Sequence, residues 1–374
     1  MRFADIPGLS DSKYLLTQAV KNNHVAHAQL FYGKPGSGNM AIALAFATYL
    51  NCTDKQENDS CGKCPSCVKM DKLVHPDLQF VFPVSATKGI SGKNVVSSSY
   101  LNEWREFLIA NPFGSLEDWS GHYGAENKQA NISKEESRNI VKSMTMTSFE
   151  GEYKVLIIWL PENMHSTAAN GILKILEEPP AKTIFIMVSC DYERLLTTIL
   201  SRCQLFKIPN FSTEDIETYL TKTHNLLPER AKTIAALSEG SIRTAIENID
   251  ESENDDHAIF RDWMRQCWTK DFIKINQTND IFFKMSKTAQ KLFLQYAINM
   301  LRHALVHSVW PEESEKLNSD EQGFVANFGK ALNEQKIEVI SSEINTALYH
   351  IERNANIRIL FLDLSIRIGQ AMTA

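Results

Sequence analysis

A glycine-rich stretch near the start of the chain has the residue types that bind phosphate. An apolar run, 29–32, leads into Gly33-Lys34-Pro35-Gly36-Ser37-Gly38, and helical spacing begins at Asn39. This order of strand, tight loop and helix brings backbone N–H groups and the positive end of a helix to an anion. The stretch fits the glycine positions of G-x-x-x-x-G-K-[ST]. The alternative is a glycine-rich turn with no link to nucleotide binding.

Two positions of this loop depart from a working nucleotide site. Asn39 stands where the lysine for the β- and γ-phosphates belongs, and Met40 replaces the hydroxyl that holds Mg²⁺. A loop that keeps its glycines but lacks these groups is not expected to hydrolyse a nucleotide. Backbone N–H groups alone are able to hold a phosphate, so the pattern leaves open whether ATP or ADP still binds.

Four cysteines follow the helix after the loop. Cys52, Cys61, Cys64 and Cys67 have the spacing Cys-x8-Cys-x2-Cys-x2-Cys. Four thiolates suit tetrahedral Zn²⁺ and leave no coordination position for water, so the pattern predicts a structural zinc module over 52–67. Free thiols or a redox pair are the alternatives, although a redox pair needs fewer cysteines.

A second motif of nucleotide hydrolysis is also missing. The continuous apolar run 154–160 predicts a strand buried on both faces. An ATPase with a phosphate loop places Asp-Glu at the end of such a strand, and this chain has Leu160-Pro161-Glu162. Glu162 is open to interpretation as a displaced catalytic carboxylate. The joint loss of both motifs is better explained by a lost activity.

Strands and helices alternate from residue 29 to residue 208, which predicts an α/β doubly wound parallel sheet. From Pro209 onward the periodicity is helical. The capping box Ser133 and Glu136 predicts the start of a helix that runs to about residue 146. The expected strands are 29–32, 78–84, 154–160, 183–188 and 204–208. The expected later helices are 213–223, 228–237, one from 239, 272–285, 289–309, 322–332 and 335–370.

The segment 85–131 interrupts this alternation. It reads as a Ser/Gly/Lys-rich loop, a helix over 100–110 and a turn-rich piece over 111–124. Lys88 and Lys93 lie among glycines and could contact phosphate, whereas a solvated insertion also has this composition.

The bulk composition is that of a soluble globular protein. The chain has 374 residues, 43% of them hydrophobic and 22% charged, and its net charge is -6. An acidic balance does not predict broad nucleic-acid binding, so DNA contacts should be local or supplied by partners. No signal peptide and no membrane-length apolar run is visible, which predicts a cytoplasmic protein.

Several motifs together resemble the clamp-loader branch of the AAA+ proteins, the subunits that serve DNA polymerase III in DNA replication. The most specific are the run AANGILKILEEPP at 168–180 and the triplet Ser201-Arg202-Cys203. The four cysteines, the Gly-Ser-x-Arg motif at 240–243 and the run 354–360 match the family as well. The resemblance implies an AAA+ nucleotide-binding-like domain over 1–209, a helical lid over 210–250 and a helical collar for oligomerisation over 251–374.

Within that resemblance, Arg202 is expected to reach the ATP of a neighbouring subunit as an arginine finger, and Arg243 to face the chain's own pocket. Surface ion pairing of Arg202 and a helix-start role for Arg243 are the alternatives. The implied partners are gamma/tau-like and delta-like loader subunits, the sliding clamp and primer-template DNA. The implied function is that of a loader subunit without ATP hydrolysis. Alternatives are a gamma/tau-type ATPase and a separate zinc and nucleic-acid binding protein.

Overall fold

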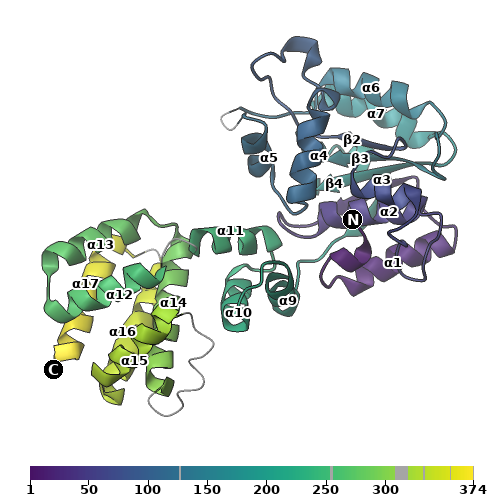
Figure 1. Cartoon of the computed structure of the whole chain (residues 1–374). Coiled ribbons are helices and arrows are strands. Elements are labelled where there is room, and N and C mark those ends of the chain that lie inside the picture. Colours follow the sequence, from purple (N-terminus) through teal and green to yellow (C-terminus); the bar gives the residue numbers. More distant parts are fainter. Residues whose placement is uncertain (126–127, 253–255, 308–318, 332, 354, 374) are drawn as a thin grey trace. The chain divides into compact units, whose positions relative to one another are not determined.

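The computed structural model describes residues 1–125, 128–252, 256–307, 319–331, 333–353 and 355–373 (Figure 1). Contacts divide the chain into two compact units. The first contains Met1–Ala231 and Ser238–Thr244, and the second contains Lys232–Leu237 and Ala245–Ala374. The predicted division at 209/210 and 250/251 into three domains stays a prediction.

A five-stranded sheet is the centre of the first unit, with the order β2-β3-β4-β1-β5. Every neighbouring pair of strands is parallel. The strands are β1 (Ala28–Tyr32), β2 (Leu78–Val81), β3 (Lys154–Trp159), β4 (Thr183–Ser189) and β5 (Gln204–Lys207). The carboxyl ends of β1, β3 and β4 therefore meet at one edge, where ligands bind in open α/β sheets.

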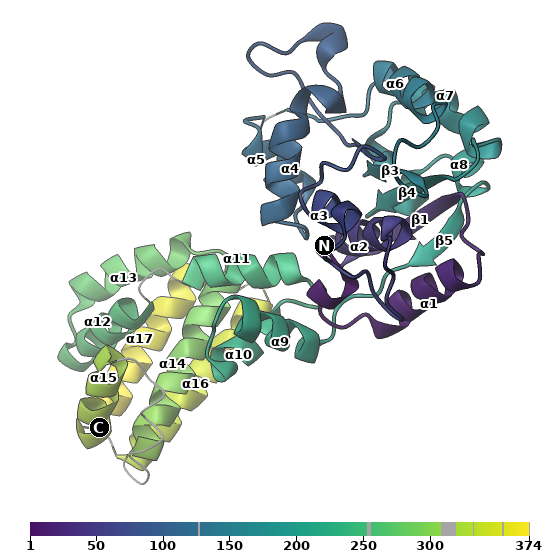
Figure 2. The ribbon, with the colours of Figure 1, turned by 45° about the vertical axis from the view of Figure 1, so that its right-hand side comes forward.

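Helices cover both faces of this sheet (Figures 1 and 2). Helices α6 and α7 pack on one face through apolar side chains that include Ile140, Ile172 and Leu176. Helix α2, which is buried along its whole length, lies on the other face with α1 and α3. The α-helices that lie wholly within the first unit are α1 (Ser10–Lys21), α2 (Asn39–Asn51), α3 (Pro65–Asp71), α4 (Leu101–Ala110), α5 (Leu116–His122), α6 (Lys134–Met144), α7 (Ser166–Glu177), α8 (Thr197–Leu200) and α9 (Thr213–Thr223).

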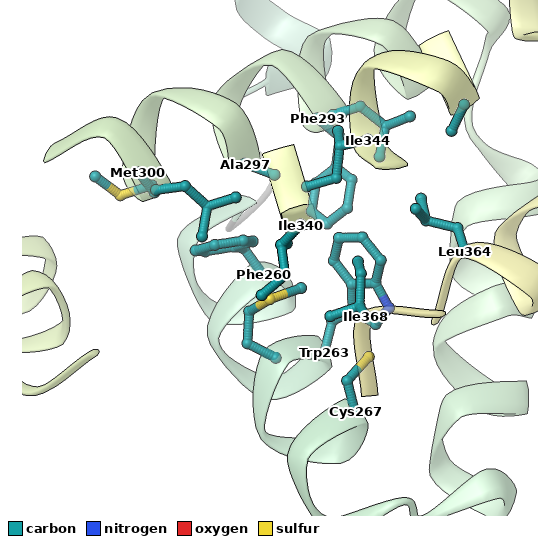
Figure 3. Packing of buried hydrophobic residues seen from close by; sticks show 14 of the residues in the cluster. Phe260, Trp263, Cys267, Phe293, Ala297, Met300, Ile340, Ile344, Leu364 and Ile368 are labelled. Atoms are coloured by element: carbon teal, nitrogen blue, oxygen red, sulfur yellow. The ribbon is translucent and has the colours of Figure 1, made fainter. Parts of the chain in front are cut away.

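The second unit is built from helices only in its described part. Its core contains the buried side chains of Phe260, Trp263 and Phe293 (Figure 3). Trp263 stacks on Phe361 at 4.8 Å between ring centroids and donates its indole N–H to the Ser365 hydroxyl at 2.9 Å. Two helices, α10 (Pro228–Leu237) and α11 (Ile242–Ser252), cross the division between the units. The others are α12 (Asp256–Thr269), α13 (Phe272–Lys284), α14 (Lys287–His307), α15 (Ser319–Ala331), α16 (Glu334–Glu352) and α17 (Ile357–Thr373).

The predicted fold class, a parallel α/β sheet followed by an all-α region, is confirmed. The single helix expected over 335–370 is wrong, because α16 ends at Glu352 and α17 begins at Ile357. The piece 111–124 is not only turns, since α5 forms within it. Some residues of the predicted segments lie outside the described residues: 308–309, 332 and 354 in the helical segments, and 126–127 in the insertion.

The predicted capping box of α6 is wrong as well. Ser133 precedes the helix, but its side chain makes no capping hydrogen bond. The Glu136 carboxylate instead accepts the backbone N–H of Ser97 at 2.6 Å, and burial raises the pKa of Glu136. A contact between segments that are distant in sequence has replaced the local one. The strand expected over 78–84 is also shorter, since β2 ends at Val81.

None of the helices in the described ranges has the length and apolar content needed to cross a membrane.

Candidate functional site

The glycine loop lies between the end of β1 and the start of α2, as the sequence predicts for a phosphate-binding loop. Gly38 is the residue before α2, so the N-terminus of a 13-residue helix opens directly behind the loop. Gly36 has φ of +77°, a left-handed conformation that favours glycine. The predicted order of strand, tight loop and helix is therefore present.

The Asn39 side chain is hydrogen-bonded within this loop and to the end of β4. Its side-chain N–H₂ donates to the carbonyl oxygens of Gly33 at 3.2 Å and Ser189 at 3.3 Å, and its Oδ1 accepts the Ser37 hydroxyl at 2.8 Å. The side chain is buried and neutral, so it bridges β1 and β4 where a lysine would direct its charge at phosphate. Met40 is buried in the same way and offers no oxygen for Mg²⁺.

The residues 238–244 lie against the outer side of the loop. A Cβ placed on Gly36 would overlap the Ser241 hydroxyl and would lie 3.2 Å from Cβ of Arg243. The backbone N–H of Ile242 donates to the Gly36 carbonyl at 3.2 Å. Arg243 is thus beside the loop, as the resemblance implies.

The Glu162 carboxylate accepts hydrogen bonds from the turn that follows β4. Its Oε1 accepts the backbone N–H groups of Cys190 at 2.9 Å and Asp191 at 3.2 Å, which fixes the turn after β4. Burial raises the pKa of Glu162 in spite of these hydrogen bonds. These contacts do not support the interpretation of Glu162 as a displaced catalytic carboxylate.

Arg202 lies just after α8, and its side chain contacts Glu177, Thr198 and Ser201. Its Nε donates to Oε1 of Glu177 at 2.7 Å, and its Nη2 contacts the same oxygen. Its Nη1 donates to the Thr198 carbonyl at 2.6 Å and to the Ser201 hydroxyl at 3.2 Å. The side chain is 29% exposed and Glu177 is 47% exposed, so solvent reaches the pair.

Arg243 forms an ion pair with the insertion. Its Nε donates to Oδ2 of Asp118 at 2.6 Å and its Nη2 donates to Oδ1 at 3.1 Å, a two-point contact. Burial acts to raise the pKa of Asp118, but hydrogen bonds from Arg243 and Ser115 outweigh it and hold that pKa below its ordinary value.

The four cysteines come together as their spacing predicts. Their sulfur atoms all lie within 4.8 Å of one another, and Cys61 Sγ is 3.9 Å from Cys67 Sγ. Zinc–sulfur bonds of about 2.3 Å in a tetrahedron place sulfurs about 3.8 Å apart, so this group fits a zinc ion. Backbone N–H groups also point at the sulfurs, for example Cys64 N–H at 3.3 Å from Cys61 Sγ. Such donors stabilise thiolates.

The sequence did not reveal two acidic partners at these sites. Glu177 is part of the run 168–180 but carried no assigned role, and Asp118 lies in a piece expected to be turns. The only local signal at Asp118 is its spacing from Ser115, which predicts a helix cap. That cap is present, with the Ser115 N–H donating to Asp118 at 2.7 Å.

Comparison with known proteins identifies a family that this chain matches. Residues 9–212 match the model of the family described as "DNA polymerase III, delta subunit". The chain is 26% identical over 247 residues to DNA polymerase III subunit delta' of Bacillus subtilis, covering 66% of this chain and 60% of that protein. It is 28% identical over 220 residues to subunit delta' of Escherichia coli, covering 59% and 53%. The chain thus spans little more than half the length of these relatives.

A solved structure of a DNA polymerase III gamma subunit-related protein from Thermotoga maritima is similar over 96% of this chain and 100% of its own, at 13% identity and a TM-score of 0.36. A score this low carries no conclusion about function.

Proposed function

This chain belongs to the DNA polymerase III delta subunit family, and we propose that it acts as a delta-prime-like clamp-loader subunit that hydrolyses no ATP itself. Its task in this proposal is to supply Arg202 to the ATP site of a neighbouring gamma/tau-like subunit while the sliding clamp is loaded onto primer-template DNA. A delta-like subunit is the other expected partner.

The observation that carries the proposal is the contrast between a disabled loop and an intact arginine. Asn39 is buried and bonded to the loop itself, and Met40 offers no metal ligand. Arg202, by contrast, keeps its charge in a solvent-accessible position at the end of a helix. The Nε and Nη2 groups that now contact one Glu177 oxygen are the pair with which a planar guanidinium can bind two oxygens of a phosphoryl group.

The test of the proposal is ATP turnover by the reconstituted loader. With Arg202→Ala, DNA-stimulated turnover at the site that receives this arginine should fall by about 10³-fold, because trans arginine fingers contribute about 10³–10⁵ in rate. The matched control is Arg194→Ala, which removes another exposed arginine from the same segment. Turnover and clamp loading equal to those of the wild-type loader would remove the finger from the proposal.

A gamma/tau-type ATPase is the second candidate, because the tau subunit of Escherichia coli is also 26% identical over 255 residues, 67% of this chain. This candidate predicts ATP turnover by the purified chain alone, abolished by Gly38→Val. The non-hydrolysing role predicts no turnover above that of the Gly38→Val variant.

We also propose that the four cysteines bind one structural zinc ion. The proposal is supported by the mutual distances of the sulfurs and by the N–H groups directed at them. Elemental analysis of the purified chain should find about one zinc per molecule, and Cys64→Ser should reduce it, with Cys190→Ser as the control outside the cluster. Four titratable free thiols in the cluster and no zinc after purification in zinc-containing buffer would contradict the site.

A further inference from the structure

The insertion 85–131 is held in place by aromatic side chains in its described part. Trp104 on α4 stacks on Phe82 at 4.1 Å between centroids, and Trp119 on α5 lies 5.0 Å from Trp104. Both indoles are fully buried, and the Trp119 N–H donates to the Pro83 carbonyl at 2.9 Å. Aromatic burial of this extent fixes α4 and α5 beside the end of β2. Lys88 and Lys93, to which the solvated interpretation applied, are exposed, whereas α4 and α5 are anchored by these rings.

From this anchor, α5 directs Asp118 at Arg243. The carboxylate takes two hydrogen bonds from the guanidinium, at 2.6 and 3.1 Å, and one from the Ser115 backbone at 2.7 Å. The side chains of Asp118 and Arg243 are only 28% and 21% exposed. The charge of Arg243 is therefore paired with the Asp118 carboxylate, which the hydrogen bond from Ser115 at the start of α5 already orients.

The same arginine borders the glycine loop. Cβ of Arg243 lies within 3.2 Å of the position that a Cβ on Gly36 would take, and Ile242 is hydrogen-bonded to Gly36. The insertion makes a second contact here, because Phe113 packs edge-on against Phe211 at 5.8 Å between centroids. The Phe211 ring also lies beside Gly38, because a Cβ placed on Gly38 would be 3.0 Å from Cζ of Phe211. The loop, the segment 238–244 and the insertion thus form one continuous set of contacts within the first unit.

We propose that the insertion acts as an internal ligand of the former nucleotide pocket: the Asp118 carboxylate occupies Arg243 in place of a polyphosphate and keeps the pocket closed. The ligand class that it excludes is the nucleoside di- or triphosphate, whose oxygens would make the same two-point contact. The inference rests on the proposed function only in taking 33–40 as a former phosphate loop.

Nucleotide binding to the purified full chain tests this closure. A fluorescent ADP analogue is titrated in the presence of Mg²⁺, with inorganic pyrophosphate as the competitor. Asp118→Asn removes the charge with little change of shape, and Glu117→Gln makes the same charge change on an exposed neighbour. The apparent affinity should rise by about tenfold or more with Asp118→Asn, because it scales with the fraction of molecules whose pocket is open. It should stay at the wild-type level with Glu117→Gln, and the gain should vanish in Asp118→Asn/Arg243→Ala.

Hydrogen exchange of the backbone amides of 115–122 gives a second readout that does not depend on ligand binding. Arg243→Ala leaves α5 without its partner, so these amides should exchange faster than in the wild type, while those of α6 should not change. Unchanged exchange in 115–122 would overturn the closure. Tight binding by the wild-type chain, equal to that of Asp118→Asn, would overturn it as well.

The two experiments separate this inference from the proposed function. Loss of loader turnover with Arg202→Ala and no effect of Asp118→Asn would leave the finger standing and refute the closure. Enhanced binding with Asp118→Asn and no effect of Arg202→Ala would do the reverse.

Discussion

Arg202 and Arg243 lie in similar ion pairs with different surroundings. Arg243 is paired with Asp118, which is 28% exposed, is oriented by Ser115 and belongs to a helix anchored by a buried tryptophan. Arg202 is paired with Glu177, which is 47% exposed at the end of α7. An exposed pair stabilises by at most about 1 kcal/mol, so Arg202 can leave Glu177 at little cost. The comparison sets an arginine whose carboxylate partner lies on an anchored helix against one whose carboxylate partner lies at an exposed helix end.

Replacement of each arginine by lysine should give the largest difference in ATP turnover between variants of the two sites. Arg202→Lys keeps the charge but loses the planar fork, so turnover at the neighbour's site should fall on the order of 10²-fold or more in the reconstituted loader. Arg243→Lys should leave turnover near the wild-type value, because Arg243 contacts Asp118 of its own chain and the proposal assigns it no transferred phosphoryl group. ATP turnover at saturating DNA measures both. Equal losses in the two variants would break the comparison.

The Asp118 pair should show its contribution in a pH-dependent stability. The pKa of Asp118 is held below its ordinary value, so its contribution is present above the unfolded-state pKa, about 4, and is lost as pH falls through that region. At pH 7, Asp118→Asn should lower the free energy of opening of α5 by about 1.5–3 kcal/mol, because hydrogen bonds to charged groups contribute this much. The difference between variant and wild type should shrink progressively as pH falls below about 4 toward the lowered pKa of Asp118.

Hydrogen exchange of 115–122 at several pH values, corrected for intrinsic exchange rates, measures this difference. The Glu117→Gln variant provides the baseline for a lost surface charge. A difference that stays the same from pH 7 to pH 3 would show that Asp118 acts through its shape and not through its charge.

Substitution of Glu177 should have the smallest effect on ATP turnover. Glu177→Gln removes the carboxylate that competes with a phosphoryl group for Arg202, so turnover in the loader should rise by about two- to fivefold, the equivalent of an exposed ion pair. Glu178→Gln makes the same change one residue later and should leave turnover at the wild-type level. A fall in turnover with Glu177→Gln would mean that this carboxylate positions Arg202 for its contact with the neighbour's phosphate.

Some patterns between near neighbours in sequence are confirmed by the structure, whereas the capping box of Ser133 and Glu136 is not. The glycine loop, the cysteine group and the buried strand after Tyr153 depend on residues that follow one another in the chain. Helix ends were less well predicted, as the division between α16 and α17 shows. Helix α5 was missed because a helix of seven residues has little intrinsic stability and forms here by burying Trp119.

The sequence by itself determined the alternation of strands and helices, the absence of a lysine at position 39 and of a hydroxyl at position 40, and the closeness of the four thiols, because each depends on residues that lie near one another in the chain. Only the tertiary structure decided which charges meet. Glu177 lies 25 residues before Arg202, and Asp118 lies 125 residues before Arg243. Neither separation has a local signature, because such pairs form only when packing of the sheet and the aromatic cluster brings distant segments together.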